Sequence, residues 1–133
     1  HNFTTGTGDT FKGALYLTSA TQNAATTAYS STGEVTGTGY TAGGVAVTNG
    51  TSPSSTNTSA TAGVAYWTPS ASFSWSNLTQ TTAFDCVLVY NSTQSNKAVS
   101  VHTFGSQTIT AGTFTLTMPS NTTSTALLRL ATT

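Results

Sequence analysis

The strongest constraint on this chain is a strict alternation of apolar residues and threonines near its C-terminal end. In the segment 113–118, Phe114, Leu116 and Met118 alternate with three threonines. A period of two places the apolar side chains on one face of a β-strand and the hydroxyls on the other. Pro119 has no amide hydrogen to donate to a ladder and predicts the end of this strand. A second apolar run at 126–131 predicts an antiparallel partner for it.

The rest of the chain repeats this pattern, because threonine and serine dominate its composition. There are 33 threonines and 17 serines among 133 residues, and only six charged side chains. Threonine is β-branched and favours a pleated surface, whereas helix-forming residues such as Glu, Lys, Arg and Met are scarce. We therefore expect an all-β protein in which glycines supply the turns.

The chain predicts a single domain over residues 1–133, of a size that one hydrophobic core can stabilise. Segment 84–90 is apolar on both faces, which indicates a central strand or a face that meets another subunit. The polar stretch 51–60 predicts an exposed, mobile loop. About eight or nine short strands favour an antiparallel β-sandwich, jelly-roll-like in connectivity. The clearest strands are expected at 11–17, 45–48, 63–68, 72–75, 84–90, 97–104, 112–119 and 126–131.

The even charge balance argues against two classes of partner. Three basic and three acidic residues leave no basic patch of the kind that binds nucleic acid or an anionic membrane surface. No run approaches the 18 apolar residues of a membrane-spanning helix. We expect neither nucleic acid nor membrane as a partner.

Enzymatic chemistry has few candidate residues. Asp9, Glu34 and Asp85 are far apart in the sequence, which does not favour a pair of glycosidase carboxylates. His102 and Asp85 are candidates for a Ser-His-Asp triad, but no Gly-x-Ser-x-Gly elbow presents a serine. His102 is expected on the more polar face of its strand. The segment 37–42 matches a loose G-x-G-x-x-A fingerprint without the strand and helix that dinucleotide binding requires. We expect no catalytic residue and no cofactor.

Two further kinds of site have candidate residues: a reactive cysteine and a copper-binding site. Cys86 is the one cysteine and lies in an apolar run, which predicts a buried, inert thiol. His1 and His102 together resemble the copper-binding histidine brace of polysaccharide monooxygenases, which would make the chain a secreted copper protein. Such proteins usually carry disulfides, which a single cysteine cannot form within the chain. We therefore expect no metal site.

Two features of the sequence point to carbohydrate: clustered aromatic residues that could bind a sugar, and asparagines that could be glycosylated. Tyr66, Trp67, Phe73 and Trp75 are candidates for a sugar-stacking platform, although side chains of this kind are more often core. Asn-x-Ser/Thr triplets suggest glycosylation of a secreted protein, but they are expected often in a chain so rich in threonine. These triplets begin at six of the eight asparagines, namely Asn2, Asn49, Asn57, Asn77, Asn91 and Asn121.

Four blocks in one order resemble a family of small virion structural proteins of tailed bacteriophages. They span residues 6–16 (GTGDTFKGALY), 32–44 (TGEVTGTGYTAGG), 89–99 (VYNSTQSNKAV), and 112–119 (GTFTLTMP) together with 126–131 (ALLRLA). The resemblance covers nearly the whole chain. Members of that family usually have a short segment before the first block, so His1 is not expected to be a processed terminus.

The resemblance implies a non-enzymatic β-sandwich of the virion, with no catalytic residues to transfer. Small jelly-roll proteins of this size and character serve as capsid cement or decoration proteins. The expected partners are therefore the major capsid protein and further copies of the chain in a homo-oligomer, and the expected location is the outer capsid surface. The alternative is a tail- or fibre-associated module that binds carbohydrate or a receptor.

Overall fold

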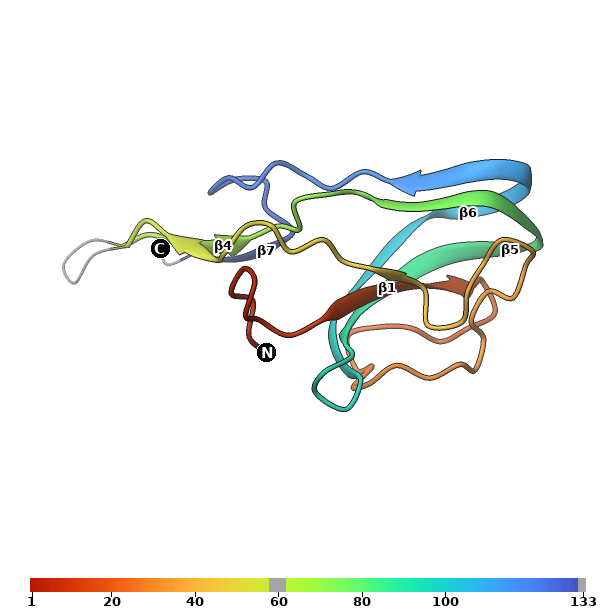
Figure 1. Ribbon diagram of the computed structural model, residues 1–133, viewed down its shortest axis with the longest axis horizontal. Helices are drawn as coiled ribbons and strands as arrows, with labels where there is room; N and C mark the ends of the chain where they lie inside the picture. Colours follow the sequence, from red (N-terminus) through yellow and green to blue (C-terminus); the bar gives the residue numbers. More distant parts are fainter. Residues whose placement is uncertain (58–61, 132–133) are drawn as a thin grey trace.

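The computed structural model describes residues 1–57 and 62–131, and its regular elements are all β-strands. They form two antiparallel sheets, with strand orders β2-β1-β5-β6 and β3-β4-β7 (Figure 1). The predicted all-β fold with antiparallel sheets, of the β-sandwich type, is confirmed. The strands are β1 (Phe11–Leu17), β2 (Val45–Ala46), β3 (Ser54–Ser55), β4 (Val64–Trp67), β5 (Phe73–Asn91), β6 (Lys97–Leu116) and β7 (Leu128–Ala131).

The body is built around one long hairpin, β5–β6, which curls over itself (Figure 1). The register between the two strands shifts at four places between Trp75 and Cys86, and such bulges bend a strand instead of ending it. Asn77 and Ala111 have positive φ angles of 54° and 47° within the bent part. As a result the first third of β5 and the end of β6 form one layer. The last third of β5, the start of β6 and β1 form the other.

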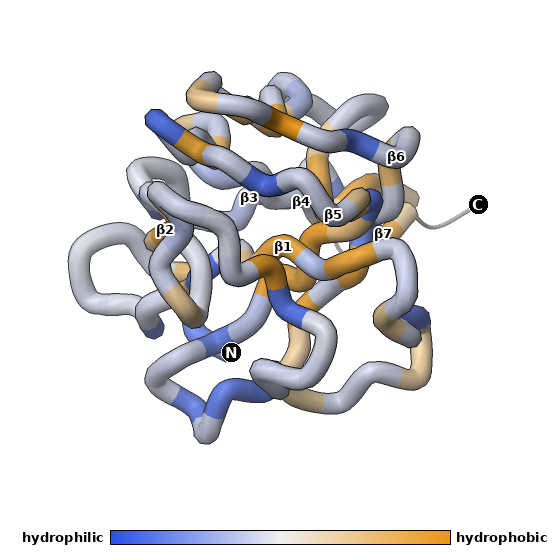
Figure 2. The backbone as a smooth tube through the Cα atoms, turned by 90° about the vertical axis from the view of Figure 1, so that its right-hand side faces the viewer, coloured by the Kyte–Doolittle hydropathy of each residue, from blue (hydrophilic) through white to orange (hydrophobic). Residues whose placement is uncertain are grey.

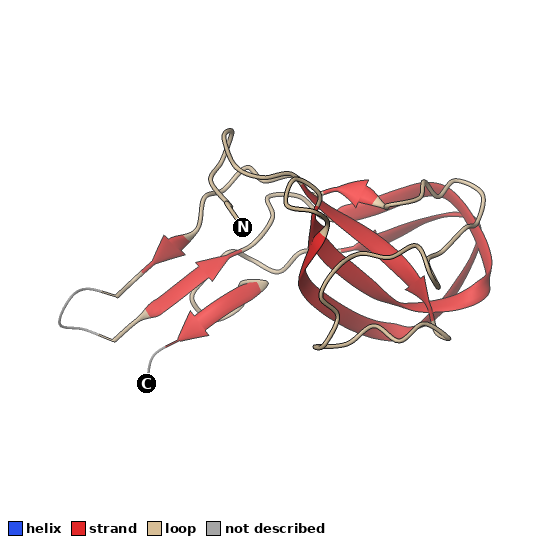
Figure 3. Ribbon diagram, turned by 90° about the horizontal axis from the view of Figure 1, so that it is seen from below, coloured by secondary structure: helices blue, strands red, loops and turns tan. Residues whose placement is uncertain are grey.

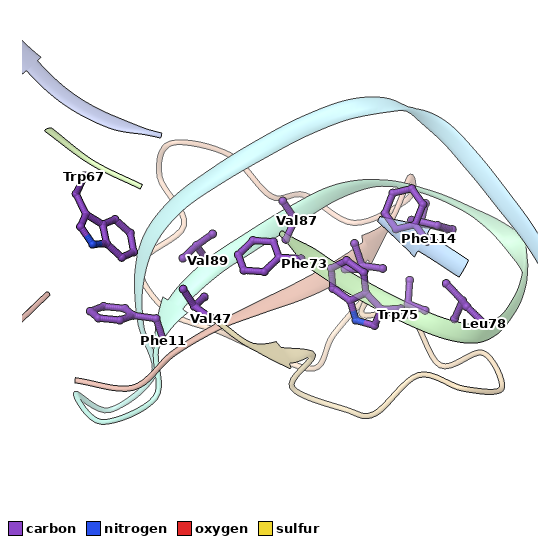
Figure 4. Close-up of a cluster of buried hydrophobic side chains, with 12 residues drawn as sticks. Phe11, Val47, Trp67, Phe73, Trp75, Leu78, Val87, Val89 and Phe114 are labelled. Atoms are coloured by element: carbon purple, nitrogen blue, oxygen red, sulfur yellow. The ribbon is translucent and has the colours of Figure 1, made fainter. Parts of the chain in front are cut away.

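The main hydrophobic core lies between these two layers (Figure 4). One layer contributes Phe73, Trp75 and Phe114, and the other contributes Phe11 and Val89, all of them buried. Phe84 meets Phe114 edge to face with ring centroids 5.0 Å apart. Of the four aromatic residues expected more often in the core than on a platform, Trp67, Phe73 and Trp75 are buried, whereas Tyr66 is half-buried.

A smaller core covers the outer face of β1 and β5, where Ala14, Tyr16, Cys86, Leu88 and Tyr90 are buried. Hydrophobic residues accordingly concentrate along β1 and β5 (Figure 2). The cover comes from the chain between β1 and β2, where Tyr29 stacks on Tyr90 at a centroid distance of 4.7 Å. Segment 84–90 is thus buried on both faces within one chain, which is the first of the two predicted alternatives.

The three-stranded sheet β3-β4-β7 extends from one end of the body (Figure 3). Aromatic rings attach it to the body. Trp67 of β4 is buried and lies against Phe3. Phe3 in turn stacks on Phe11 of β1, with ring centroids 4.5 Å apart and an angle of 4° between the ring planes. The indole Nε1 also donates to Thr51 O at 2.9 Å and to Asn49 Oδ1 at 3.2 Å. This projecting sheet is therefore joined to the body by packing around one tryptophan.

Several predictions about connectivity were wrong. The segments 72–75 and 84–90 belong to one strand, as do 97–104 and 112–119, so the described residues form seven strands and not eight or nine. The alternating segment 113–118 does not pair with 126–131. Instead Phe114 pairs with Trp75 in β5, and Leu128 pairs with Trp67 in β4. The jelly-roll connectivity is not confirmed by these strand orders.

The polar stretch 51–60 is only partly as expected. Ser54 and Ser55 are exposed but form β3, which pairs with β4. Residues 58–60 of the predicted mobile loop lie outside the described residues. The alternation within 113–118 is confirmed, because Phe114 is buried, Leu116 and Met118 are half-buried, and the three threonines are exposed.

Candidate functional site

Glu34 is a buried carboxylate held by three hydrogen-bond donors. The Oε1 atom accepts from the Tyr40 hydroxyl at 2.8 Å and from Gly43 N at 2.7 Å, and Oε2 accepts from the Tyr29 hydroxyl at 2.7 Å. The Tyr40 oxygen in turn accepts from Leu15 N at 2.9 Å. Burial, together with the hydrogen bond to Glu34, raises the pKa of both phenols, so they remain neutral donors. Glu34 therefore anchors the covering segment to β1.

Asp9 has a comparable structural role near the other end of β1, where its carboxylate accepts hydrogen bonds from three residues. Its Oδ2 atom accepts from Asn91 Nδ2 at 2.6 Å and from Asn2 N at 2.9 Å, and Oδ1 accepts from Gln94 Nε2 at 3.3 Å. The hydrogen bonds from Asn2 and Asn91 lower the pKa of Asp9. Because the fully buried Asn91 ends β5, these bonds connect the N-terminal segment to the β5–β6 turn.

The structure does not assemble a triad from His102 and Asp85. It gives the two side chains no hydrogen bond to each other, and His102 Nε2 lies 2.9 Å from Ser100 Oγ. His102 was expected on a polar face, but it is half-buried and lines a small hollow of about 170 Å³ with Phe73 and Val87. Burial lowers its pKa. The reason for the error is that β6 curls around the core, so this side of the strand faces apolar residues.

His1 and His102 also have different neighbours. His1 Nδ1 lies 2.9 Å from Asn91 Nδ2 at the end of β5, whereas His102 pairs with Val87. Four residues of strand, about 13 Å, separate Val87 from Asn91. Within residues 1–57 and 62–131, no group of three His, Cys, Asp or Glu side chains is placed to hold a metal ion.

The remaining sequence candidates are placed in the interior or in turns. Cys86 is buried as predicted, and burial raises the pKa of its thiol to about 11. Trp67 and Trp75 are each 2 % exposed, which removes the aromatic platform on which the carbohydrate alternative depended. Of the possible glycosylation sites, Asn91 is fully buried and the Asn49 side chain bonds both Trp67 and Phe3 O.

The glycines of the G-x-G-x-x-A segment have a packing role instead. Thr38 pairs with Thr79 in the bent part of β5, and Thr79 N donates to Thr38 O at 2.8 Å. A Cβ atom on Gly37 would collide with Thr79 O, and one on Gly39, whose φ is +81°, with Asn77 O. The segment needs glycine because its backbone lies directly against β5.

The first candidate interaction surface is the projecting sheet. Register places Ala65, Trp67, Leu128 and Leu130 on one face, since Ala65 pairs with Leu130 and Trp67 with Leu128. The body covers Trp67, but Leu130 is 74 % exposed. A hollow of about 290 Å³ beside it is bordered by Phe3, Tyr66 and Leu128 among others. This face continues the apolar core outward without a cover in the described residues.

The second candidate surface is the free edge of β6. A hollow of about 500 Å³ lies between this edge and the loop 22–26, and its lining includes Gln22, Asn23, Val99 and Val101. Sequence reasoning missed it, because sheet order and the fold of the loop are both needed to see that β6 is an edge strand. The open hydrogen-bonding edge and the exposed apolar face are binding features and not reactive ones.

Comparison of the chain with protein-family models, with curated proteins and with solved structures finds no match. No helix in the described part of the chain is long and apolar enough to cross a membrane.

Proposed function

We propose that this protein is a non-enzymatic virion structural protein of a tailed bacteriophage. It attaches to the outer surface of the capsid as a cement or decoration protein and stabilises the shell by binding the major capsid protein. The proposal starts from the four sequence blocks that resemble small virion proteins. It is supported by what those blocks do in the fold and by the kind of surface that the fold presents.

One observation carries the proposal: hydrogen bonds join three of the four blocks, namely 6–16, 32–44 and 89–99. Asp9 of block 6–16 accepts from Asn91 of block 89–99 at 2.6 Å. Leu15 of the first block donates to Tyr40 of block 32–44, which also supplies Glu34. Residues of these three blocks thus connect β1 to the covering segment and to the β5–β6 turn, as expected of a protein whose task is to keep its shape while bound.

The surface suits attachment to a neutral protein lattice. Charged residues make up 5 % of the chain with no net charge, and the exposed alternation in 113–118 presents hydroxyls. Affinity would come from apolar contact and hydroxyl hydrogen bonds. Weak contacts of this kind become strong when copies of the protein bind as a homo-oligomer to a repeating lattice.

Quantitative mass spectrometry of purified virions tests the proposal. We expect many copies of the chain per particle, in a fixed ratio to the major capsid protein. Absence from particles would overturn the virion assignment, and a few copies that purify with isolated tails would overturn the capsid location. Rebinding of the purified chain to stripped shells should change little between low and moderate salt, because few charges are present to be screened.

A further inference from the structure

The outer side of β6 is already occupied by the chain itself at its first residues. Ala28 pairs with Lys97 in an antiparallel bridge, Ala98 N donates to Thr27 O at 2.9 Å, and Tyr29 N donates to Asn96 O at 2.9 Å. The chain then leaves this position at a turn in which Thr26 N donates to Asn23 O at 3.0 Å. Alongside Val99–Thr103, the described residues place no further strand.

The backbone beyond this point faces outward. Val35 N donates to Leu15 O at 3.0 Å, so the backbone N–H and C=O groups of Leu15 point away from β5. Leu15 pairs with Val87, and the backbone groups of Val87 therefore point toward β6. Val87 pairs with His102, so the backbone N–H and C=O groups of His102 point toward β5. By alternation Val101 and Thr103 direct their N–H and C=O groups outward. The structure gives these groups no protein partner within the described ranges.

The hollow lined by Val99–Thr103 and loop 22–26 has enough volume for a short strand. A strand residue fills about 160 Å³, from a rise of about 3.3 Å, a spacing of about 4.8 Å and a thickness of about 10 Å. The hollow of about 500 Å³ therefore holds about three residues of extended chain. An α-helix satisfies its own backbone groups and could not pair with this edge.

The lining restricts the chemistry of the occupant. Among the residues that the structure describes, no charged side chain lines the hollow, so a charged occupant would lose hydration without gaining a partner. Asn23 Oδ1 and Gln22 Oε1 are already used within the loop, as acceptors from Ala25 N at 2.8 Å and from the Thr26 hydroxyl at 3.2 Å. Both residues line the hollow, and neither of their amide NH₂ groups is used in these bonds.

We propose that the groove between Val99–Thr103 and loop 22–26 binds an extended, uncharged segment of the major capsid protein as an added β-strand. This inference rests on the proposed function, since the partner is the surface to which the protein attaches. Main-chain hydrogen bonds at Val101 and Thr103 would supply affinity, and the neutral groove would supply selectivity. The bridge at Ala28 would fix the place where the added strand begins.

The test compares two substitutions at one position in binding to stripped shells. Val101→Pro removes the outward N–H, and proline is tolerated where that side of an edge strand faces solvent. Val101→Thr keeps the backbone donor and a similar side-chain shape, and serves as the matched control. We expect Val101→Pro to weaken binding at least tenfold and Val101→Thr less than about threefold, the backbone hydrogen bonds being the main source of affinity. Equal binding by all three proteins would overturn the inference.

Hydrogen exchange of the wild-type protein gives a second readout that does not depend on the folding of a variant. The Val101 and Thr103 amides should exchange quickly in the free protein and become protected on shells. Attachment without this protection would refute the added strand while leaving the proposed function intact. Failure of the wild-type protein to attach would overturn both. Concentration-dependent protection without shells, accompanied by dimers in sedimentation, would identify a second copy as the occupant and refute the capsid segment.

Discussion

The rings of Phe3 and Trp67 lie with their centroids 4.5 Å apart, and this contact joins the projecting sheet to the body of the protein. Phe3 is half-buried and lies between Trp67 and Phe11. Within the described residues no strand of the projecting sheet pairs with a strand of the body. The orientation of that sheet therefore depends on this aromatic packing and on the hydrogen bonds that Trp67 Nε1 donates.

Phe3→Ala should therefore loosen the projecting sheet more than the body. We expect a loss of about 1–3 kcal/mol, below the cost of removing a fully buried phenylalanine. Amide exchange should accelerate in β4 and β7 and stay unchanged in β1 and the last third of β5. Phe104→Ala removes a half-buried ring from the same core without touching Phe3 and is the control. Equal acceleration in both variants would contradict a local joint.

Asp9 should make stability depend on acid. Its pKa is lowered in the folded protein by the hydrogen bonds from Asn2 and Asn91. The stabilisation is thus present above the unfolded pKa of about 3.9 and is lost as the pH falls through the lower folded value. Asp9→Asn should flatten the acid limb of a plot of unfolding free energy against pH. Asp85→Asn removes a carboxylate for which the structure gives no hydrogen bond, and is the control. The fall of unfolding free energy at acid pH should be larger in Asp85→Asn than in Asp9→Asn. Identical curves for the two variants would refute the role of the Asp9 hydrogen bonds.

Glu34→Gln should destabilise the fold by about 1–3 kcal/mol, because a buried amide cannot accept hydrogen bonds from all three donors. Urea unfolding measures the loss. Tyr29→Phe removes one donor and should cost about 1 kcal/mol in the wild-type protein and less in the Glu34→Gln background. Additive effects of the two substitutions would show that the hydroxyl and the carboxylate do not act together.

Cys86 should resist modification in the native protein. The thiol is buried and its pKa is raised to about 11, so the reactive thiolate is scarce at neutral pH. We expect a disulfide reagent to label it slowly in buffer and completely in denaturant. Rapid labelling of the native protein would mean that the outer cover over β5 opens readily.

Leu130→Asp tests the projecting sheet as a contact surface. Leu130 is 74 % exposed, so the unfolding free energy should change by less than about 0.5 kcal/mol. Shell binding should weaken at least tenfold if this face is buried on attachment, since an unpaired charge would be desolvated. Thr123→Asp adds the same charge at another exposed position and is the control. Equal binding by both variants would exclude this face from the interface.

Strands could be predicted from the sequence where a short segment shows a clear pattern of apolar residues. Segment 84–90 is apolar on both faces and is the central strand, and the alternation around Phe114 correctly separates core from solvent. The partner of each strand was not predictable, because the pattern specifies which face is buried and not which strand lies alongside. No strand was expected between 75 and 84, yet bulges let this stretch continue β5 around the bend.

The candidate site was less accessible to sequence reasoning. Glu34 was considered only as a possible catalytic acid, although one carboxylate near Tyr29 and Tyr40 in a chain with so few charges is a signal for a buried network. The free edge of β6 depends on sheet order, which arises from contacts distant in the sequence.

The curled β5–β6 hairpin also suggests an order of events during folding. Its turn, residues 92–96, closes a short loop, and Ser95 and Asn96 adopt positive φ angles there. Each further pair then forms next to one already made, out to Phe73 with Leu116, so no single step has to close a long loop. Both layers of the body come from this hairpin, so zipping from one turn would bring their strands together before β1 and the projecting sheet are added. Mutations beside the turn should therefore slow folding, and mutations at Trp67 should mainly speed unfolding.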